Sequence, residues 1–296
     1  MTHDVIVIGG SYAGMAAALQ LLRARRSVLV IDAGQRRNRT AEASHGFLGQ
    51  DGVDPGRIAA EARAQLERYQ TLTWIEGEAV AAGGSRDSFE VLTSDGTRHA
   101  GRRLLFATGV RDALPPVEGL AERWGRHAFH CPYCHGYELE MGRIGVIATG
   151  PSSLHQALML PEWGQVTLLV NDALTLDDEA RAELDARGIA IEETPIARLS
   201  GEATAELTDG RSLTFAGLFV ASTTSPATPL AQEMGCALQE TPMGMQLQTD
   251  DLKETSIPGA YACGDTARMP HSVSLAVADG AWAGATIHRS LIFPAA

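Results

Sequence analysis

The sequence lacks several features that would each point to a class of protein. None of its 296 residues lies in an apolar run approaching the roughly 20 residues that cross a bilayer, so we do not expect a membrane protein. Basic residues are not in excess: the formal net charge of -12 argues against nucleic acid or an anionic membrane surface as a partner. The opening MTHDVIVIGG has neither the basic region nor the long apolar region of a signal peptide. We therefore expect a cytoplasmic protein.

Cysteine is also scarce, with four residues in the chain. In the cytoplasm structural disulfides are rare, so a close pair of cysteines is more often catalytic or metal-binding. The close pair here is Cys131 and Cys134. The isolated Cys236 and Cys263 are expected to be buried, inert thiols.

The length favours two domains, and two βαβ patterns divide the chain accordingly. Residues 4–9 (DVIVIG) and 27–32 (SVLVID) are apolar runs typical of buried parallel strands, and residues 11–26 between them have helical composition. A linker-like stretch follows at residues 113–119, and the pattern restarts with an apolar strand at residues 143–148. The sequence predicts an α/β fold with two Rossmann-like nucleotide-binding domains.

The end of the chain is expected to return to the first domain. From about Gly244 the sequence is polar, and then AYACGD (residues 260–265) leads into a helix of small residues that begins near Ser272. These elements are too short to fold alone. We expect a first domain of residues 1–114 and 244–296, with residues 115–243 inserted as the second.

A dinucleotide site is predicted at the first strand–helix turn. The motif GGSYAG stands where G-x-G-x-x-G is expected, and an acidic residue ends the next strand. Glycine lets backbone N–H groups approach a pyrophosphate at the helix N-terminus, and the carboxylate accepts a ribose hydroxyl. The candidate residues are Gly9, Ser11, Tyr12, Ala13, Gly14 and Asp32.

The segment CPYCH permits three interpretations of the cysteine pair. It matches the C-x-x-C-H pattern of haem attachment, although that chemistry belongs to exported proteins. Zinc needs two further ligands, and the nearby His130 and His135 directly adjoin the cysteines, where chelation of one ion is strained. A redox pair needs only two neighbouring sulfurs, one to attack a disulfide and one to resolve it. The residues favour the redox pair and predict no metal site.

Together the motifs resemble the thioredoxin reductase-like flavoproteins over nearly the whole chain. GGSYAG, the ATG of residues 107–109, the C-x-x-C pair and the late ACGD occur in that family's order. The resemblance implies FAD in the first domain, a nicotinamide-type domain inserted in it, and a homodimer. It implies these further cofactor-binding residues: Ala107, Thr108, Gly109, Gly264, Asp265, Ser272 and Val273.

The resemblance also assigns catalytic roles. Cys134 is expected to lie nearer the flavin, and Cys131 to exchange with substrate. His135, where many relatives carry an acid, is expected to take and return protons near neutral pH. His271 is either a second base or a helix-entry residue. Arginines 36, 37 and 39 are expected to be solvated beside the FAD adenosine.

The second nucleotide site departs from the family. Its turn has Ala148 for the first glycine, and Pro151 removes a backbone donor where N–H groups would face a pyrophosphate. Asp172 lies where NADPH-dependent relatives carry arginines, and a carboxylate repels a 2′-phosphate. An NADP site is therefore expected to be degenerate.

The segment CPYCHGYE, with histidine after the second cysteine, resembles a narrower subgroup, the dithiol oxidases of disulfide natural products of the gliotoxin, holomycin and romidepsin type. That resemblance implies FAD-dependent oxidation of a small-molecule dithiol, with oxygen or another acceptor. The alternatives are a thioredoxin reductase that draws on NADPH or ferredoxin, and a flavin-binding redox sensor without turnover.

Overall fold

The first lobe is built on a seven-stranded sheet in which strands from both ends of the chain meet. The structure is a computed structural model that describes residues 2–293. Strand order is β3-β2-β1-β6-β5-β4, with β19 also paired to β6, and β1, β2, β3, β6 and β19 are parallel. The strands are β1 (Thr2–Ile8), β2 (Val28–Asp32), β3 (Leu72–Glu76), β4 (Ala79–Ser85), β5 (Ser88–Thr93), β6 (Arg98–Phe106) and β19 (Ala260–Ala262).

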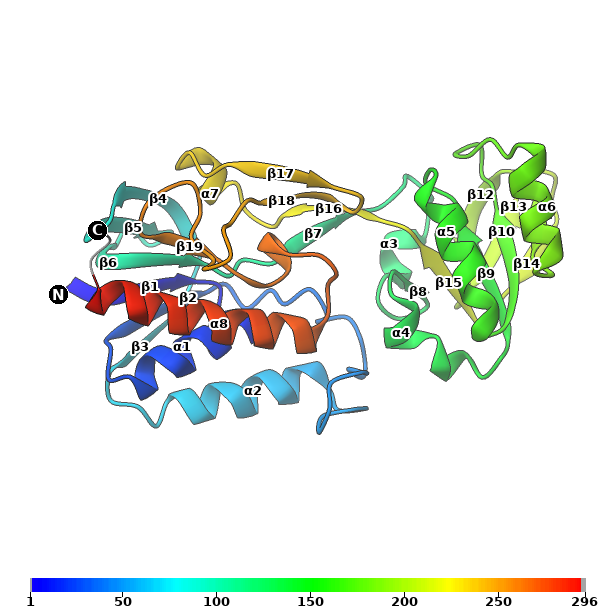
Figure 1. The fold of residues 1–296 in the computed structure, drawn as a ribbon. Coiled ribbons are helices and arrows are strands. Elements are labelled where there is room, and N and C mark those ends of the chain that lie inside the picture. Colours follow the sequence, from blue (N-terminus) through cyan, green and yellow to red (C-terminus); the bar gives the residue numbers. More distant parts are fainter. Residues whose placement is uncertain (1, 294–296) are drawn as a thin grey trace.

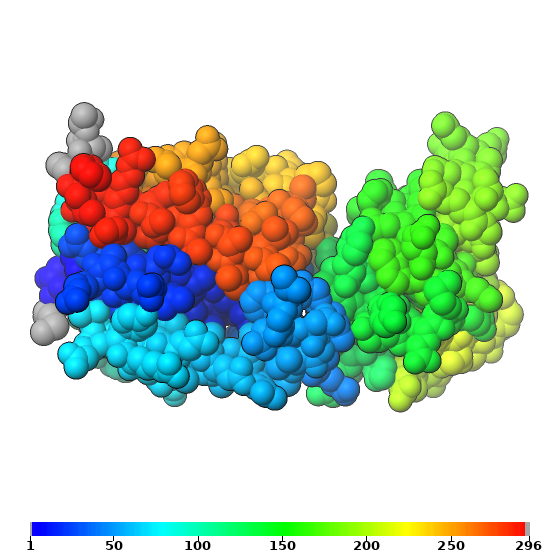
Figure 2. Space-filling model, turned by 60° about the horizontal axis from the view of Figure 1, so that its bottom comes forward, coloured from blue at the N-terminus to red at the C-terminus, as the bar shows by residue number. Residues whose placement is uncertain are grey.

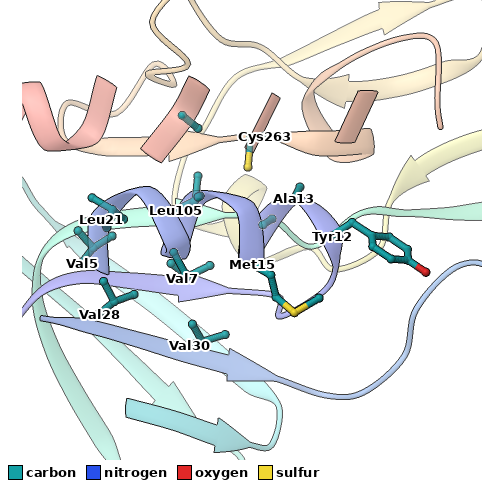
Figure 3. Close-up of a cluster of buried hydrophobic side chains, with 14 of the residues drawn as sticks. Val5, Val7, Tyr12, Ala13, Met15, Leu21, Val28, Val30, Leu105 and Cys263 are labelled. Carbon is teal, nitrogen blue, oxygen red and sulfur yellow. The ribbon is translucent and has the colours of Figure 1, made fainter. Parts of the chain in front are cut away.

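Two helices far apart in the sequence pack together on one face of this sheet (Figure 1). They are α1 (Tyr12–Arg23) and α8 (Val273–Ile292), with α2 (Pro55–Leu66) beside α1. The apolar runs of β1 and β2 face α1 through Val5, Val7, Val28 and Val30, which are all fully buried (Figure 3). Cys263 closes the same cluster from the strand end that precedes α8, so both ends of the chain share one core.

The second lobe has a five-stranded, wholly parallel sheet of order β11-β10-β9-β15-β8. Its strands are β8 (Ala128–Phe129), β9 (Arg143–Ile147), β10 (Gln165–Leu169), β11 (Ala190–Glu192) and β15 (Gly217–Val220). Helices and 3₁₀ turns of this lobe are α3 (Leu120–Arg123), α4 (Pro132–His135), η1 (Tyr137–Leu139), α5 (Ser152–Met159), η2 (Leu160–Glu162) and α6 (Asp178–Ala186). A small antiparallel sheet is formed by β12 (Ile196–Ser200), β13 (Thr204–Leu207) and β14 (Ser212–Thr214).

Two antiparallel strands carry the chain between the lobes (Figure 1). They are β7 (Val110–Ala113) and β16 (Thr223–Pro226), and a four-stranded sheet of order β17-β18-β16-β7 continues from them. Its other strands are β17 (Leu238–Thr241) and β18 (Gly244–Leu247), with α7 (Leu230–Glu233) between β16 and β17.

The chain returns to the first lobe earlier than the sequence indicates. Leu230 and Cys236 are buried in one cluster with Ile6 and Phe106 of the first sheet. The expected crossing at residue 244 is therefore too late, and we place it near Ser222. Sequence alone gave no boundary there because the segment after Ser222 combines short strands with a one-turn helix.

The two lobes touch beyond these crossings. Figure 2 shows the segment after β2, in mid-blue, against the green second lobe. There His45 Nε2 lies 3.4 Å from a carboxylate oxygen of Glu138, and Gly125 is so close to Thr40 that a Cβ would overlap its side chain. Between residues 2 and 293, no helix has the length and apolar character needed to span a bilayer.

Candidate active site

A cavity of about 510 Å³ opens at the carboxyl ends of the parallel strands β1, β2 and β6 and extends to the second lobe. This is the edge at which open α/β sheets bind ligands. Sixteen of the seventeen predicted site residues line it: Gly9, Ser11, Tyr12, Ala13, Asp32, Ala107, Thr108, Gly109, Cys131, Cys134, His135, Gly264, Asp265, His271, Ser272 and Val273. The exception is Gly14, which packs against Gly9 and Ala107, two residues of the lining.

The first glycine loop has the geometry of a phosphate cradle. Gly9 has φ +104°, and a Cβ there would overlap the carbonyl of Ala107, so the loop and the ATG segment touch. A Cβ on Gly14 would overlap the carbonyl oxygen of Gly9. Only glycine permits this approach, which brings the N-terminus of α1 to the cavity. Tyr12 also lines the cavity, and its hydroxyl donates to Pro55 O at 3.1 Å.

The late GD turn is held by a buried carboxylate. Gly264, with φ +72°, donates its N–H to Asp279 Oδ2 on α8 at 2.9 Å. Asp279 is only 7% exposed and also lies 2.7 Å from Lys253 Nζ. This fixes the turn so that Asp265 points into the cavity, beside the N-terminus of α8 where the Ser272 hydroxyl accepts from Leu275 N.

These residues fit the FAD that the family resemblance implies. Asp265 Oδ1 and Asn38 Oδ1 are buried without a hydrogen-bond partner among the described residues, and both can accept from sugar hydroxyls or a ring N–H. Asp32 Oδ1 accepts from Gly10 N at 3.0 Å, which leaves its second oxygen for a ribose hydroxyl. The N-terminus of α1 suits a pyrophosphate.

Cys131 and Cys134 are joined by a disulfide, and both line this cavity. Cys131 precedes the one-turn helix α4, in which Pro132 occupies the first position, and Cys134 lies within it. The turn keeps the two Cα atoms 5.3 Å apart, as a disulfide requires. Cys236 and Cys263 are buried, and burial raises the pKa of both thiols.

The sequence suggested that His135 takes and returns protons near neutral pH, but its surroundings in the structure lower its pKa. Its ring stacks on Phe129 with centroids 4.2 Å apart, and burial, with a smaller effect of His45, lowers its pKa to about 4. The imidazole is therefore neutral at pH 7 and is an acceptor or a neutral donor beside the disulfide. His271 also has a lowered pKa, because burial outweighs the opposing charge of Asp265.

Arg37 was expected to be solvated, but its side chain is only 24% exposed and its guanidinium is paired. Its guanidinium donates to both oxygens of Asp112, at 2.6 and 2.9 Å, and to Asp265 Oδ2 at 3.3 Å. Sequence reasoning missed Asp112 and Ser222 entirely, and passed over His130 except as a zinc ligand. The only signal was that His130 adjoins Cys131 and that Asp112 follows the ATG segment by three residues.

The second strand–helix turn uses its own backbone donors. Thr149 N donates to Ser153 Oγ at 2.9 Å, and Ser153 N donates back to Gly150 O at 3.0 Å. Leu154 N donates to the carbonyl of Pro151. Asn171 and Asp172 form a tight turn with positive φ at both residues, and Asn171 Oδ1 accepts from Ile196 N.

The fold and the disulfide beside a dinucleotide cradle define a class of enzyme. Residues 3–280 match the family described as pyridine nucleotide-disulphide oxidoreductase, and the chain belongs to that family. It has the thioredoxin reductase-like form of the fold and is an oxidoreductase acting on sulfur groups.

The chain is similar to particular members of this class. Thioredoxin reductase tcpT of Claviceps purpurea is 32% identical, over 98% of this chain and 94% of that protein. The crystal structure of an oxidoreductase from Agrobacterium tumefaciens is 52% identical over the full length of both chains, with a TM-score of 0.97. The crystal structure of HlmI is 33% identical over 98% of this chain and 93% of that chain, with a TM-score of 0.91.

Proposed function

We propose that the protein uses FAD to oxidise a small-molecule dithiol to a disulfide, with oxygen or another acceptor. The observation that carries the proposal is the position of the Cys131–Cys134 disulfide, which lines the same cavity as the glycine loop of β1 and the Gly264–Asp265 turn. The cysteines and the cofactor cradle come from different lobes, and only their meeting in one cavity makes a redox path.

The chain's own sulfurs carry out the exchange. A substrate thiolate attacks Cys131, the Cys134 thiolate leaves, and a mixed disulfide forms between substrate and Cys131. The second thiol of the same substrate molecule then attacks the substrate sulfur of the mixed disulfide, which releases a cyclic disulfide and leaves both enzyme cysteines reduced. The two protons lost by the substrate thiols end on the two cysteine sulfurs, and the neutral imidazole of His135, next to Cys134 in the chain, can donate its N–H to the Cys134 thiolate. FAD held in the cradle supplies the two-electron acceptor that restores the disulfide.

Features of the second lobe favour electron flow from the substrate to the flavin. In the turn at residues 148–154, the N–H groups of Thr149, Ser153 and Leu154 already donate within the turn, and Pro151 has no N–H to offer a pyrophosphate. Asp172 places a carboxylate where a 2′-phosphate would lie in NADPH-dependent relatives. Together with the CPYCHGYE segment, these features favour the oxidase. The small-molecule substrate and a homodimer are part of the proposal.

A thioredoxin reductase is the second candidate. Curated relatives that cover almost the whole chain carry that name, among them tcpT and the 30% identical sirT of Leptosphaeria maculans. Such an enzyme would run the same disulfide in the opposite direction, with NADPH or ferredoxin as the electron source.

One pair of measurements separates the candidates. Anaerobic addition of NADPH should leave the flavin absorbance unchanged in the oxidase, whereas rapid bleaching would establish the reductase. With dithiothreitol as the test dithiol, steady consumption of oxygen or of an added artificial electron acceptor is expected. Absence of both, together with no flavin response to NADPH or reduced ferredoxin, would leave only a sensor. A Cys134→Ser variant should lose turnover while keeping bound FAD, and wild-type rates in that variant would refute the disulfide mechanism.

A further inference from the structure

A partly buried polar network joins the cofactor cradle to the redox segment, and Arg37, which itself lines the cavity with Asp112 and His130, lies at its centre. The guanidinium donates bidentately to Asp112, and its Nη1 reaches both Asp265 Oδ2 at 3.3 Å and His271 Nδ1 at 2.9 Å. Asp265 and His271 line the cavity on the cradle side. Asp112 lies in β7, the first strand that crosses to the second lobe. One side chain therefore holds the cradle and the crossing together.

The network continues into the second lobe through Ser222, the residue before the returning strand β16. The Ser222 hydroxyl donates to Asp112 Oδ1 at 3.0 Å and lies 3.2 Å from His130 Nδ1. Since the single hydroxyl proton goes to Asp112, the Ser222 oxygen must accept from His130 Nδ1–H. This sets the tautomer of a neutral imidazole, because burial, aided by Arg37, lowers the pKa of His130. His130 directly precedes Cys131.

The central ion pair is too enclosed to be incidental surface pairing. The side chain of Asp112 is 9% exposed and that of Arg37 is 24% exposed. Burial raises the pKa of Asp112, but hydrogen bonds and charge from Arg37 reverse this and hold it below its usual range. Removing the guanidinium would leave the Asp112 carboxylate enclosed and unpaired, which is strongly unfavourable. The ion pair therefore holds Asp112, and with it the crossing strand β7, against Arg37. The fork of Arg37 is required, since an ammonium cannot meet this set of partners in one plane.

We propose that Arg37 is a positioning residue for the redox reaction. Through Asp112, Ser222 and His130, it fixes the distance and orientation of Cys131 and Cys134 relative to the cradle residues Asp265 and His271. This inference rests on the proposed function for the role of the disulfide. It assigns to Arg37 no contact with substrate. Arg37 acts on the distance and orientation between two lobes that, within residues 2–293, are joined through the strands β7 and β16.

The test uses the full-length FAD-loaded protein with Arg37→Gln, Arg37→Lys, Ser222→Ala and the Arg37→Gln/Ser222→Ala double variant. Dithiothreitol and oxygen are the substrates. A misplacement on the order of 1 Å costs about 10²-fold in rate, so kcat for Arg37→Gln should fall about 10- to 100-fold. Arg37→Lys should stay below wild type. Arg57→Gln is the matched control, because Arg57 is exposed and pairs only with Glu61 among the described residues.

The decisive readout is the long-wavelength absorbance that a thiolate in contact with oxidised flavin produces in the partly reduced protein. It should weaken in Arg37→Gln and Ser222→Ala at equal FAD content, and the double variant should be no worse than Arg37→Gln, since both act through one chain of contacts. Full absorbance in Arg37→Gln, or fully additive losses, would overturn the inference. Because this absorbance does not depend on turnover, failure of wild type to oxidise dithiothreitol would refute the proposed function alone.

Discussion

Replacement of His135 by phenylalanine should make the protein less sensitive to acid. The folded His135 has a pKa of about 4, whereas an unfolded histidine has 6.5. Between these pH values His135 is protonated in the unfolded chain and neutral in the folded chain. The free energy of unfolding therefore rises with pH in this range. Its contribution is fully favourable above the unfolded pKa and is lost as pH falls from about 6.5 to about 4.

The size of the effect follows from proton linkage. At about pH 5 the unfolded imidazole is almost wholly protonated and the folded one almost wholly neutral, which corresponds to about 2 kcal/mol for a fully shielded group. The ring of His135 is partly exposed, so we expect roughly 1–2 kcal/mol after solvent screening. Phenylalanine keeps the stack on Phe129 and removes the titration.

The assay is urea unfolding at about pH 7.5 and about pH 5. Wild type and His135→Phe should be similar at the higher pH, and the variant should lose roughly 1–2 kcal/mol less on acidification. The comparison isolates this residue, because the lowered pKa values of His130 and His271 act equally in both proteins. His155→Gln, at an exposed position on α5, should follow wild type. Equal pH dependence in wild type and His135→Phe would show that burial does not shift this imidazole.

Three further substitutions test the packing and the cradle. Gly280→Ala places a Cβ against the backbone of Ala13. The overpacking cost of about 1–3 kcal/mol should outweigh the gain in helix propensity of about 1 kcal/mol, so the melting temperature should fall. Gly83→Ala is the control, because Gly83 has open space around it, and it should not lower the melting temperature. Asp265→Asn should weaken FAD about 10- to 100-fold in a fluorescence titration, since a charge-assisted hydrogen bond contributes about 1.5–3 kcal/mol; an unchanged Kd would exclude Asp265 from the cradle. Phe219→Ala, at a fully buried site, should cost about 3–5 kcal/mol in urea unfolding, and a loss below about 1 kcal/mol would contradict the tight core.

The elements that sequence predicts well are those with a short-range physical cause. The apolar runs of β1 and β2 flank a helix with a glycine turn at its start, and each part independently favours the same βαβ unit. AYACGD enters the first sheet as β19, because a fully apolar strand needs burial on both faces. The cradle residues likewise meet because parallel strands present their carboxyl ends at one edge of a sheet.

The parts that sequence misses depend on contacts between distant segments. In the sequence, Arg37 is indistinguishable from the neighbouring arginines of a surface loop. Its carboxylate partners Asp112 and Asp265 come from β7 and the Gly264–Asp265 turn, which are distant in the sequence. The lowered pKa of His135 has the same origin, because the ring is covered by Phe129 and faces His45 from the other lobe. Burial cannot be assigned to a polar residue without knowing which elements cover it.

The architecture explains why such contacts concentrate at this site. The disulfide lies in an inserted lobe and the cradle in the parent lobe, so neither local pattern can set the distance between them. Two crossing strands leave the lobes free to rotate about β7 and β16 unless side chains bridge the gap. Among residues 2–293 the polar side-chain bridges include Arg37 with Asp112 at the crossing, Ser222 with His130, and His45 with Glu138. Two of them anchor residues on either side of the cysteine pair, so the same contacts that hold the lobes also fix the segment that must deliver electrons to the cradle.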